Sequence, residues 1–299
     1  MNLTNDFKQK VLDELMQVRN NFTGSDNAFS TQWNINKSVL SRLKHGEIEG
    51  LLKDSQWLNI GRILNVNLCE RKWNTARTDV FTTIEQDIAF CRENSKARIC
   101  VDDCGIGKTY TAKYLARTLT NCFYVDASQC KSKQLFIRTI AQTIGVETKG
   151  RLADVKENIK YYIKMLPQPI IIIDEAGDLS YEAFLELKEF WNATENACGW
   201  YMMGADGLRN KIERGINCKK VGYSEIFSRY SEKYTRVVPV NTHERQGFYK
   251  KLITDVLSVN CEDNELIQKT VARCLGNDTH GVIGGLRRAE SLLLLNKKS

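Results

Sequence analysis

Two patterns of apolar and polar residues divide the chain. From residue 97 onward, short runs that are apolar at almost every position alternate with segments of helical periodicity, beginning with "KTYTAKYLARTL". Runs such as "IIII" are typical of strands buried on both faces, as in a parallel sheet with helices on each side. After residue 240 the pattern is helical. The apolar runs predict five strands, at residues 97–101, 122–127, 169–174, 199–204 and 235–240.

The first 66 residues have the pattern of short amphipathic helices. Residues 30–33 can close one helix, Asn34 suits a turn that needs a positive φ, and Asn36 can cap the next helix. Gly46 would end that helix, and "WLNIGRILNV" supplies another amphipathic one. The inward side of the capped helix would consist of Val39, Leu40 and Leu43.

The character of the chain changes at "NLCERKWNTART", which predicts a linker at residues 67–78. We therefore predict a small all-α domain at residues 1–66, an α/β core at 79–241 and a helical lid at 242–299. The core is expected to have three layers, with a five-stranded parallel sheet in the middle.

Composition limits the class of protein. Of 299 residues, 42% are hydrophobic and 26% are charged, as in ordered globular proteins. No apolar run is long enough to span a membrane, and "MNLTNDFKQK" lacks the apolar centre of a signal peptide, so we expect a cytoplasmic protein. The ten cysteines form no C-x-x-C pair and the three histidines are far apart, so we expect reduced thiols and no cysteine or histidine metal site. The net charge of +7 permits a polyanionic partner without establishing one.

A phosphate-binding motif follows the first predicted strand. The loop would point backbone N–H groups and a helix N-terminus at one spot, which suits a polyphosphate. Lys108 would reach the β and γ phosphates of ATP, and Thr109 would ligate Mg²⁺. A chance match is the alternative, which the position between strand and helix disfavours. The nucleotide-binding residues predicted here are Gly105, Ile106, Gly107, Lys108, Thr109 and Tyr110.

The motif is irregular, because Asp102 stands where G-x-x-x-x-G-K-[ST] has its first glycine, with Asp103 beside it. Aspartate is one of the few residues that tolerate positive φ, so we expect Asp102 to shape the turn. Both carboxylates should point away from the phosphates. The irregularity predicts modest affinity or slow turnover.

A second acidic motif, "IIIIDEAGDLS", comes about 65 residues later. Asp174 at the end of a buried strand could hold Mg²⁺ through water, and Glu175 could polarise the attacking water. The two acids could instead belong to an ordinary turn after a strand. The upstream phosphate loop favours the catalytic interpretation.

Together these motifs resemble the Walker A and Walker B motifs of AAA+ ATPases, and the resemblance extends over residues 76–295. It implies a sensor 1 residue, for which Asp206 is available, and a sensor 2 arginine, for which Arg287 follows one turn late. It also implies an arginine finger that reaches the neighbouring subunit's nucleotide; we favour Arg229 over Arg236. Each arginine could instead be plain surface charge. The departures from the family pattern imply slow, switch-like hydrolysis.

The N-terminal domain resembles the lambda-repressor-like helix-turn-helix, whose pattern is matched by Ile35, Asn36, Leu40, Ser41, Leu43 and Gly46. The resemblance implies that the capped helix enters the major groove of DNA. The alternative is a helical bundle with a solvated basic face. The side chains that would contact DNA are Lys37, Ser38, Ser41, Arg42 and Lys44.

The combination of both parts, with the stretch "DEAGDLSYEAFLELKEFWNATENACGWYMMGADGL", resembles the phage Mu B and Tn7-like family of transposition target-selection proteins. That resemblance implies a bacterial, phage or mobile-element protein that forms an ATP-dependent filament or ring on double-stranded DNA. It would select the target for DNA recombination, and would recruit and activate the transposase. Within the α/β core, we expect further DNA contacts in "CKSKQLFIR", at Lys131, Lys133 and Arg138. An ATP-regulated transcriptional regulator and a helicase loader of replication or plasmid maintenance remain alternatives.

Overall fold

The computed structural model describes residues 3–64, 66–68, 73–276 and 283–296. Cys69, His280 and residues 69–72 of the predicted linker lie outside the described residues. No helix in these ranges has the length and apolar character needed to cross a bilayer.

Four helices form the N-terminal part. They are α1 (Asn5–Asn21), α2 (Asp26–Gln32), α3 (Lys37–Lys44) and α4 (Asp54–Ile63). Asn34 has φ of 51°, and the Asn36 side chain accepts a hydrogen bond from the Ser38 N–H, as expected for the turn between α2 and α3. Leu40 and Leu43 are buried, while Val39 is only partly buried. The helices enclose a core of their own that includes Leu15, Phe29, Leu40, Leu43 and Trp57.

The predicted parallel sheet is confirmed. Its strands lie in the order β2-β3-β4-β1-β5, and all pairs are parallel. The strand that precedes the phosphate loop, β1, is therefore separated from β3, which ends in the two acids, by β4. The bounds are β1 (Ala97–Val101), β2 (Cys122–Asp126), β3 (Ile170–Asp174), β4 (Gly199–Gly204) and β5 (Tyr234–Thr235).

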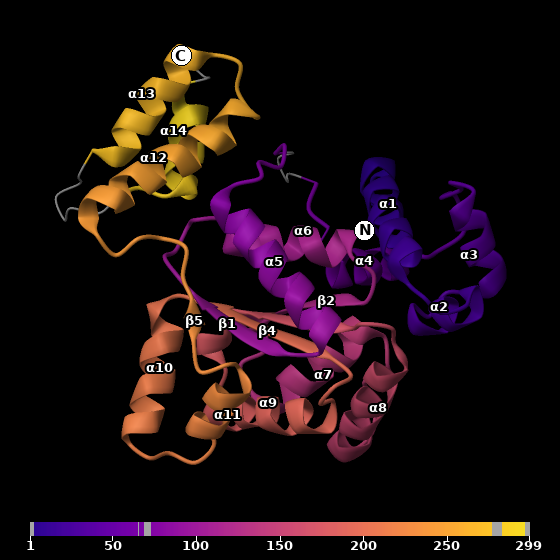
Figure 1. Ribbon diagram of the computed structural model, residues 1–299. Helices are drawn as coiled ribbons and strands as arrows, with labels where there is room; N and C mark the ends of the chain where they lie inside the picture. Colours follow the sequence, from indigo (N-terminus) through magenta and orange to yellow (C-terminus); the bar gives the residue numbers. More distant parts are fainter. Residues whose placement is uncertain (1–2, 65, 69–72, 277–282, 297–299) are drawn as a thin grey trace.

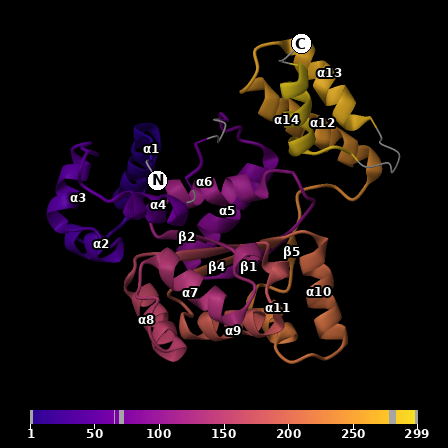
Figure 2. The same ribbon diagram turned by 180° about the vertical axis from the view of Figure 1, so that it is seen from behind.

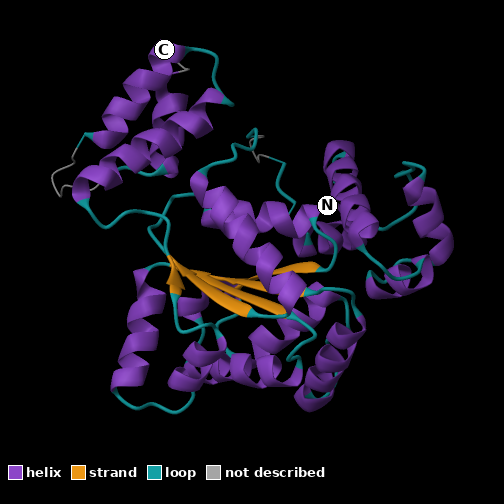
Figure 3. Cartoon of the chain, viewed as in Figure 1, coloured by secondary structure: helices purple, strands orange, loops and turns teal. Residues whose placement is uncertain are grey.

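Helices cover both faces of the sheet, which completes the three layers (Figure 1, Figure 3). Helices α5 (Asp79–Asn94) and α6 (Lys108–Thr118) lie on one face, where Ile170 and Ile172 point. Ile171 and Ile173 point to the opposite face, because side chains alternate along a strand. That face is covered by α7 (Lys133–Ile144), α8 (Leu152–Met165), α9 (Tyr181–Ala193), α10 (Asp206–Asn217) and α11 (Tyr223–Arg229), and short 3-10 helices follow β2 (Ala127–Gln129) and β3 (Ala176–Asp178).

The last strand is shorter than the predicted 235–240, because β5 ends at Thr235. The backbone N–H groups of Val237 and Val238 donate to the carboxylate of Asp102 instead of to a neighbouring strand. Pro239 has no N–H to donate. A side chain thus replaces the sheet hydrogen bonds at this point.

The lid contains α12 (Thr242–Ser258), α13 (Asn264–Leu275) and α14 (Leu286–Asn296). It has a small core that includes Ile253, Leu257, Val271 and Leu293, against which Trp73 packs. Figure 2 shows the lid beyond the carboxyl end of the sheet, next to α5. The domain boundaries stay a prediction, although α5 begins at Asp79 and α12 at Thr242.

Candidate nucleotide site

The phosphate loop joins β1 to α6, and its glycines are required by backbone geometry. Gly105 and Gly107 have φ of 72° and 100°, in the left-handed region that disfavours side chains. Gly107 is the N-cap of α6, so the N-terminal N–H groups of this helix face the loop. The loop also contacts the lid, because the Leu286 N–H donates to the Gly105 carbonyl oxygen at 2.8 Å.

Lys108 is folded back over this loop. Only 9% of the residue is exposed, and its Nζ donates to the carbonyl oxygens of Asp102 at 2.8 Å and Asp103 at 2.5 Å. These two acceptors hold the ammonium beside the space that the loop encloses.

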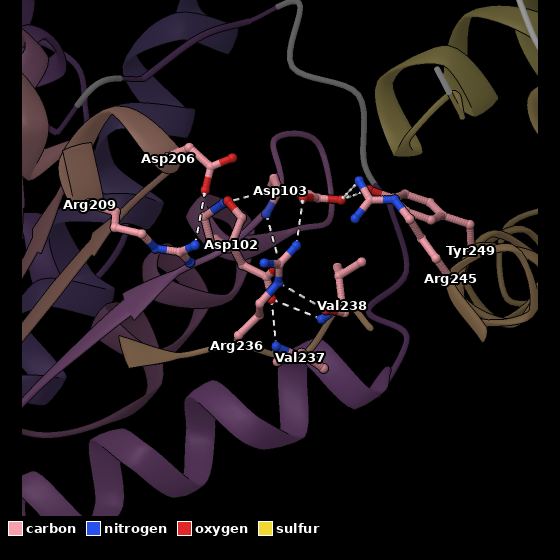
Figure 4. Close-up of polar contacts among 10 residues, drawn as sticks. Asp102, Asp103, Asp206, Arg209, Arg236, Val237, Val238, Arg245 and Tyr249 are labelled. Carbon is pink, nitrogen blue, oxygen red and sulfur yellow. Dashed lines mark hydrogen bonds and ion pairs between the residues drawn. The ribbon is translucent and has the colours of Figure 1, made fainter. Parts of the chain in front are cut away.

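Asp102 does not have the predicted role. In the loop, Gly105 and Gly107 have positive φ angles, whereas Asp102 does not. Its carboxylate is buried and accepts from the N–H groups of Val237 at 2.6 Å and Val238 at 3.0 Å (Figure 4). Asp102 therefore joins the end of β1 to the segment after β5 through its side chain, and does not shape the turn through its backbone.

Asp103 points toward the lid. Its carboxylate accepts from Arg245 and, at 2.6 Å, from the Tyr249 hydroxyl, and both donors belong to α12. Figure 4 shows the two aspartates with Arg236, whose guanidinium lies 3.9 Å from each carboxylate. Burial, and then the neighbouring Asp103, raise the pKa of Tyr249, so this hydroxyl stays a neutral donor. Both carboxylates are thus engaged by protein groups.

A cavity of about 300 Å³ lies between the phosphate loop and the lid. One wall comes from the loop and the start of α6, another from the segment before α5, and a third from the lid. Tyr110 closes part of the wall, because its hydroxyl lies 2.6 Å from Thr75 Oγ1. The residues that line the cavity include Trp73, Asn74, Phe81, Gly105, Ile106, Gly107, Lys108, Thr109, Tyr110, Glu175, Val256, Leu286 and Arg287.

Asp174 is buried at the end of β3. Its Oδ2 accepts from the Tyr124 hydroxyl at 2.9 Å, and its Oδ1 from the Glu175 N–H at 3.0 Å. Burial, followed by the nearby Asp174 charge, raises the pKa of Tyr124, so the hydroxyl remains a donor. The sequence did not identify Tyr124 as a site residue, because a tyrosine on a buried strand is typical of the core. Its position, two residues before the end of the strand next to β3, is the only sequence feature that points to the site.

Glu175 lines the cavity and has φ of 50°, which is unusual for a residue other than glycine, asparagine or aspartate. Partial desolvation, and then the Asp174 charge, raise the pKa of its carboxyl above the ordinary 4.5. Strained backbone conformations of this kind concentrate at functional sites.

The available donors fit a nucleotide-borne Mg²⁺ better than a metal site made of protein alone. No group of three or more His, Cys, Asp or Glu side chains suited to a metal occurs among the described residues. Mg²⁺ commonly uses one or two protein oxygens, phosphate oxygens and water. Thr109 and Asp174 supply a hydroxyl and a carboxylate that suit this arrangement.

The other predicted family residues lie in different places. Arg287 lines the cavity from the start of α14. Asp206 is exposed at the start of α10 and pairs with Arg209 at 3.8 Å, while Ala205 lines the cavity. The structure therefore does not bring Asp206 to the cavity wall.

The two candidate finger arginines differ in their surroundings. Arg229 does not line the cavity; it donates to Asn192 Oδ1 at 2.6 Å and to the Glu225 carbonyl oxygen at 2.7 Å. Arg236 donates to the Val238 carbonyl oxygen at 3.0 Å, beside the two loop aspartates. Both arginines are therefore engaged by groups of this chain.

The predicted DNA-binding side chains on α3, namely Lys37, Ser38, Ser41, Arg42 and Lys44, are all exposed. Arg42 pairs with Glu47 at 2.6 Å, and Lys44 with Asp26 at 2.9 Å. Such exposed pairs are weak and can exchange for phosphate contacts.

The predicted DNA-binding residues near α7 also form ion pairs or hydrogen bonds within the chain. Lys131 pairs with Asp178 at 2.8 Å and Lys133 with Glu186 at 2.6 Å. Arg138 donates to the carbonyl oxygens of Thr148 and Gly150. Arg138 therefore has a structural role in the α7–α8 connection.

Comparison with known proteins agrees with this geometry. Residues 93–212 match the AAA domain family. The AAA domain match includes the phosphate loop and both acids of β3, which supports nucleotide binding and ATP hydrolysis in general. No curated protein matched the chain.

Among solved structures, the Orc1 protein of Aeropyrum pernix, determined in complex with DNA, is similar in fold, with a TM-score of 0.51 and 14% sequence identity. The similarity covers 76% of this chain and 62% of that one, so it extends beyond the AAA domain match. At this identity the likeness concerns the fold, which is the AAA+ P-loop fold predicted from the motifs.

Proposed function

We propose that the protein is an ATP-dependent DNA-binding ATPase that forms a filament on duplex DNA, selects a transposition target, and recruits and activates a transposase. The observation that carries the proposal is the cavity itself. Lys108, Thr109, Glu175 and Arg287 line one space between the AAA domain and the lid. The basic residues of α3, in the N-terminal part that resembles a helix-turn-helix, are exposed.

The residues of this cavity, with the buried Asp174 next to Glu175, suit phosphoryl transfer to water. Lys108 would exchange its two carbonyl acceptors for phosphate oxygens, and Thr109 and Asp174 would hold Mg²⁺. Magnesium, when bound, would neutralise part of the phosphate charge. Glu175 would orient the attacking water as a carboxylate. The absence of Asp206 from the cavity wall favours slow hydrolysis.

Oligomerisation would complete the site. Arg229 is not among the residues that line the cavity of its own chain, so a phosphate contact by Arg229 requires a neighbouring subunit. A contact made only in the assembled state would couple ATP binding to assembly.

A direct contact supports coupling between nucleotide and DNA binding. Helix α6 begins at the phosphate loop and ends against α1. There, Arg117 Nε lies 3.7 Å from Glu14 Oε2, and the Arg117 carbonyl oxygen accepts a hydrogen bond from the Asn21 side chain. The DNA complex of the similar Orc1 structure also favours DNA as the partner. The transposition role rests on the sequence resemblance alone.

Footprinting on duplex DNA of mixed sequence, with and without ATP, tests the proposal. We expect continuous, ATP-dependent protection without a preferred site, because phosphate contacts carry no sequence information. One discrete operator would favour a transcriptional regulator instead. Robust hydrolysis by closed rings would favour a helicase loader, and protection that is independent of ATP would contradict the main proposal.

A further inference from the structure

Asp103 contacts two parts of the molecule that the proposed function requires to communicate. Its backbone carbonyl oxygen accepts from Lys108 Nζ at 2.5 Å. Its carboxylate accepts from Arg245 and Tyr249 of α12. A single residue thus joins the lysine of the phosphate loop to the lid.

The contact is shielded from solvent. The Asp103 side chain is 14% exposed and that of Arg245 31% exposed, and the Tyr249 ring is buried. A partly buried, charge-assisted hydrogen bond is stronger than an exposed ion pair. By contrast, the ion pair between Lys251 of α12 and Asp79 of the core, at 2.7 Å, has side chains that are 58% and 50% exposed.

Helix α12 also forms part of the cavity. Val256, seven residues after Tyr249 on the same helix, lines the space that the phosphate loop encloses. A shift of α12 relative to the loop would therefore change the cavity wall.

The two contacts of Asp103 are linked through Lys108. An ammonium group has three N–H donors, and two of them serve the carbonyl oxygens of Asp102 and Asp103. Phosphate oxygens would compete for these donors. Loss of the Lys108 contact would free the Asp103 peptide to move, and its carboxylate would move with it.

We propose that Asp103 is a positioning residue that couples the state of Lys108 to the position of the lid through Arg245 and Tyr249. The inference rests on the nucleotide-binding part of the proposed function and needs neither DNA nor a transposase. Asp102 has a separate role, because its carboxylate is directed at Val237 and Val238 and not at the lid.

Hydrogen exchange of α12 in the full-length protein, with and without ADP or a non-hydrolysable ATP analogue, tests the proposal. In the wild type, nucleotide should change the protection of residues 245–256. In Asp103→Ala, and in Arg245→Gln, which leaves the loop sequence intact, this nucleotide-dependent change should be lost. Nucleotide affinity should change by roughly 5-fold or more, the lower end of typical coupling between sites.

Two further variants separate coupling from general damage. Asp79→Asn removes the exposed ion pair with Lys251 of α12, and like Asp103→Ala it removes one negative charge. This variant should retain the response of α12 to nucleotide. The double variant Asp103→Ala, Arg245→Gln should shift nucleotide affinity no further than Asp103→Ala alone, because Asp103→Ala already removes the contact with Arg245.

The outcomes are distinct. A folded Asp103→Ala or Arg245→Gln protein with wild-type affinity and a wild-type response of α12 would overturn the inference. Failure of the wild-type protein to bind nucleotide would instead contradict the proposed function, and the inference with it. An effect of Asp79→Asn equal to that of Asp103→Ala would also overturn the inference, because any core–lid ion pair would then suffice.

Discussion

Glu175 combines a positive φ with a carboxyl group that is partly desolvated beside Asp174. We predict that Glu175→Gln lowers ATP hydrolysis roughly 100-fold or more, the range of general acid–base catalysis, while nucleotide still binds. Filaments should form and then persist. A phosphate-release assay and imaging over time provide the measurement. The control is Glu182→Gln, an exposed residue on α9. Filaments of Glu175→Gln that dissolve at the wild-type rate would remove Glu175 from the hydrolytic role.

The raised pKa of Glu175 predicts how hydrolysis and stability change with pH. Hydrolysis needs the carboxylate, so on the acid side the rate should fall at a pH above 4.5. Because the folded state binds this proton more tightly than the unfolded state, ionisation of Glu175 lowers stability as pH rises from 4.5 through the raised pKa. Glu175→Gln should therefore melt higher than the wild type at pH 7, and this advantage should shrink toward pH 4.5. An advantage that grows as pH falls would contradict the direction of the shift.

The carboxylate of Asp102 is bound by backbone N–H groups, and Asp102 is not among the residues that line the cavity. Asp102→Ala would leave the N–H groups of Val237 and Val238 without their acceptor. We predict a loss of about 1–3 kcal/mol in the free energy of unfolding, as for an unsatisfied buried donor, measured by urea denaturation. Asp102→Asn, which keeps one carbonyl acceptor, should lose less. Wild-type stability together with tighter ATP binding in Asp102→Ala would mean that the carboxylate faces the nucleotide.

At the scale of elements, α3 carries the proposed DNA contacts. We predict that Lys37→Ala weakens DNA binding similarly for all sequences and lowers the slope of log K against log salt by about 1, as for one phosphate contact. Lys164→Ala, at an exposed position near the end of α8, is the matched control. Fluorescence anisotropy at several salt concentrations gives the slope. Equal slopes for Lys37→Ala and the wild type would exclude this contact.

Strands buried on both faces could be predicted from sequence, because residues such as Ile170 to Ile173 must be apolar on each side. The turn before α3 was equally predictable, since Asn34 and Asn36 act within their own segment. The end of β5 was not predictable, because it depends on the Asp102 side chain, which lies 135 residues from Val237 in the sequence. Local patterns identify elements and caps, whereas a distant side chain determines where this strand ends.

At the scale of the whole molecule, the candidate site is made by three parts of the chain. The phosphate loop and Glu175 could be found from motif spacing, because their chemistry fixes both residue type and position. Trp73 and Asn74 line the same cavity but lie in a segment that sequence suggested was a linker. Asn74 is held on the lid by Asn260, which accepts from its N–H at 2.7 Å and donates to its carbonyl oxygen at 3.1 Å. Hydrogen bonds between residues so far apart in the chain leave no local pattern in the sequence from which they could be predicted.

The lid, the α/β core and the N-terminal helices are joined by contacts near the two ends of the segment that runs from the phosphate loop through α6. The loop contacts the lid through Asp103, and α6 contacts α1 of the N-terminal helices through Arg117. This arrangement gives a physical route by which nucleotide could alter DNA binding. Under the proposed function, assembly on DNA would depend on all of these parts together.

Electron microscopy of the protein on plasmid DNA, with ATP, without nucleotide, and with Lys108→Ala, tests this central claim most directly. Lys149→Ala, an exposed lysine outside the cavity, serves as the control. The account predicts filaments that coat the DNA for the wild type and the control with ATP, and bare DNA without nucleotide or with Lys108→Ala. Filaments that form equally well without nucleotide, or with Lys108→Ala, would contradict it.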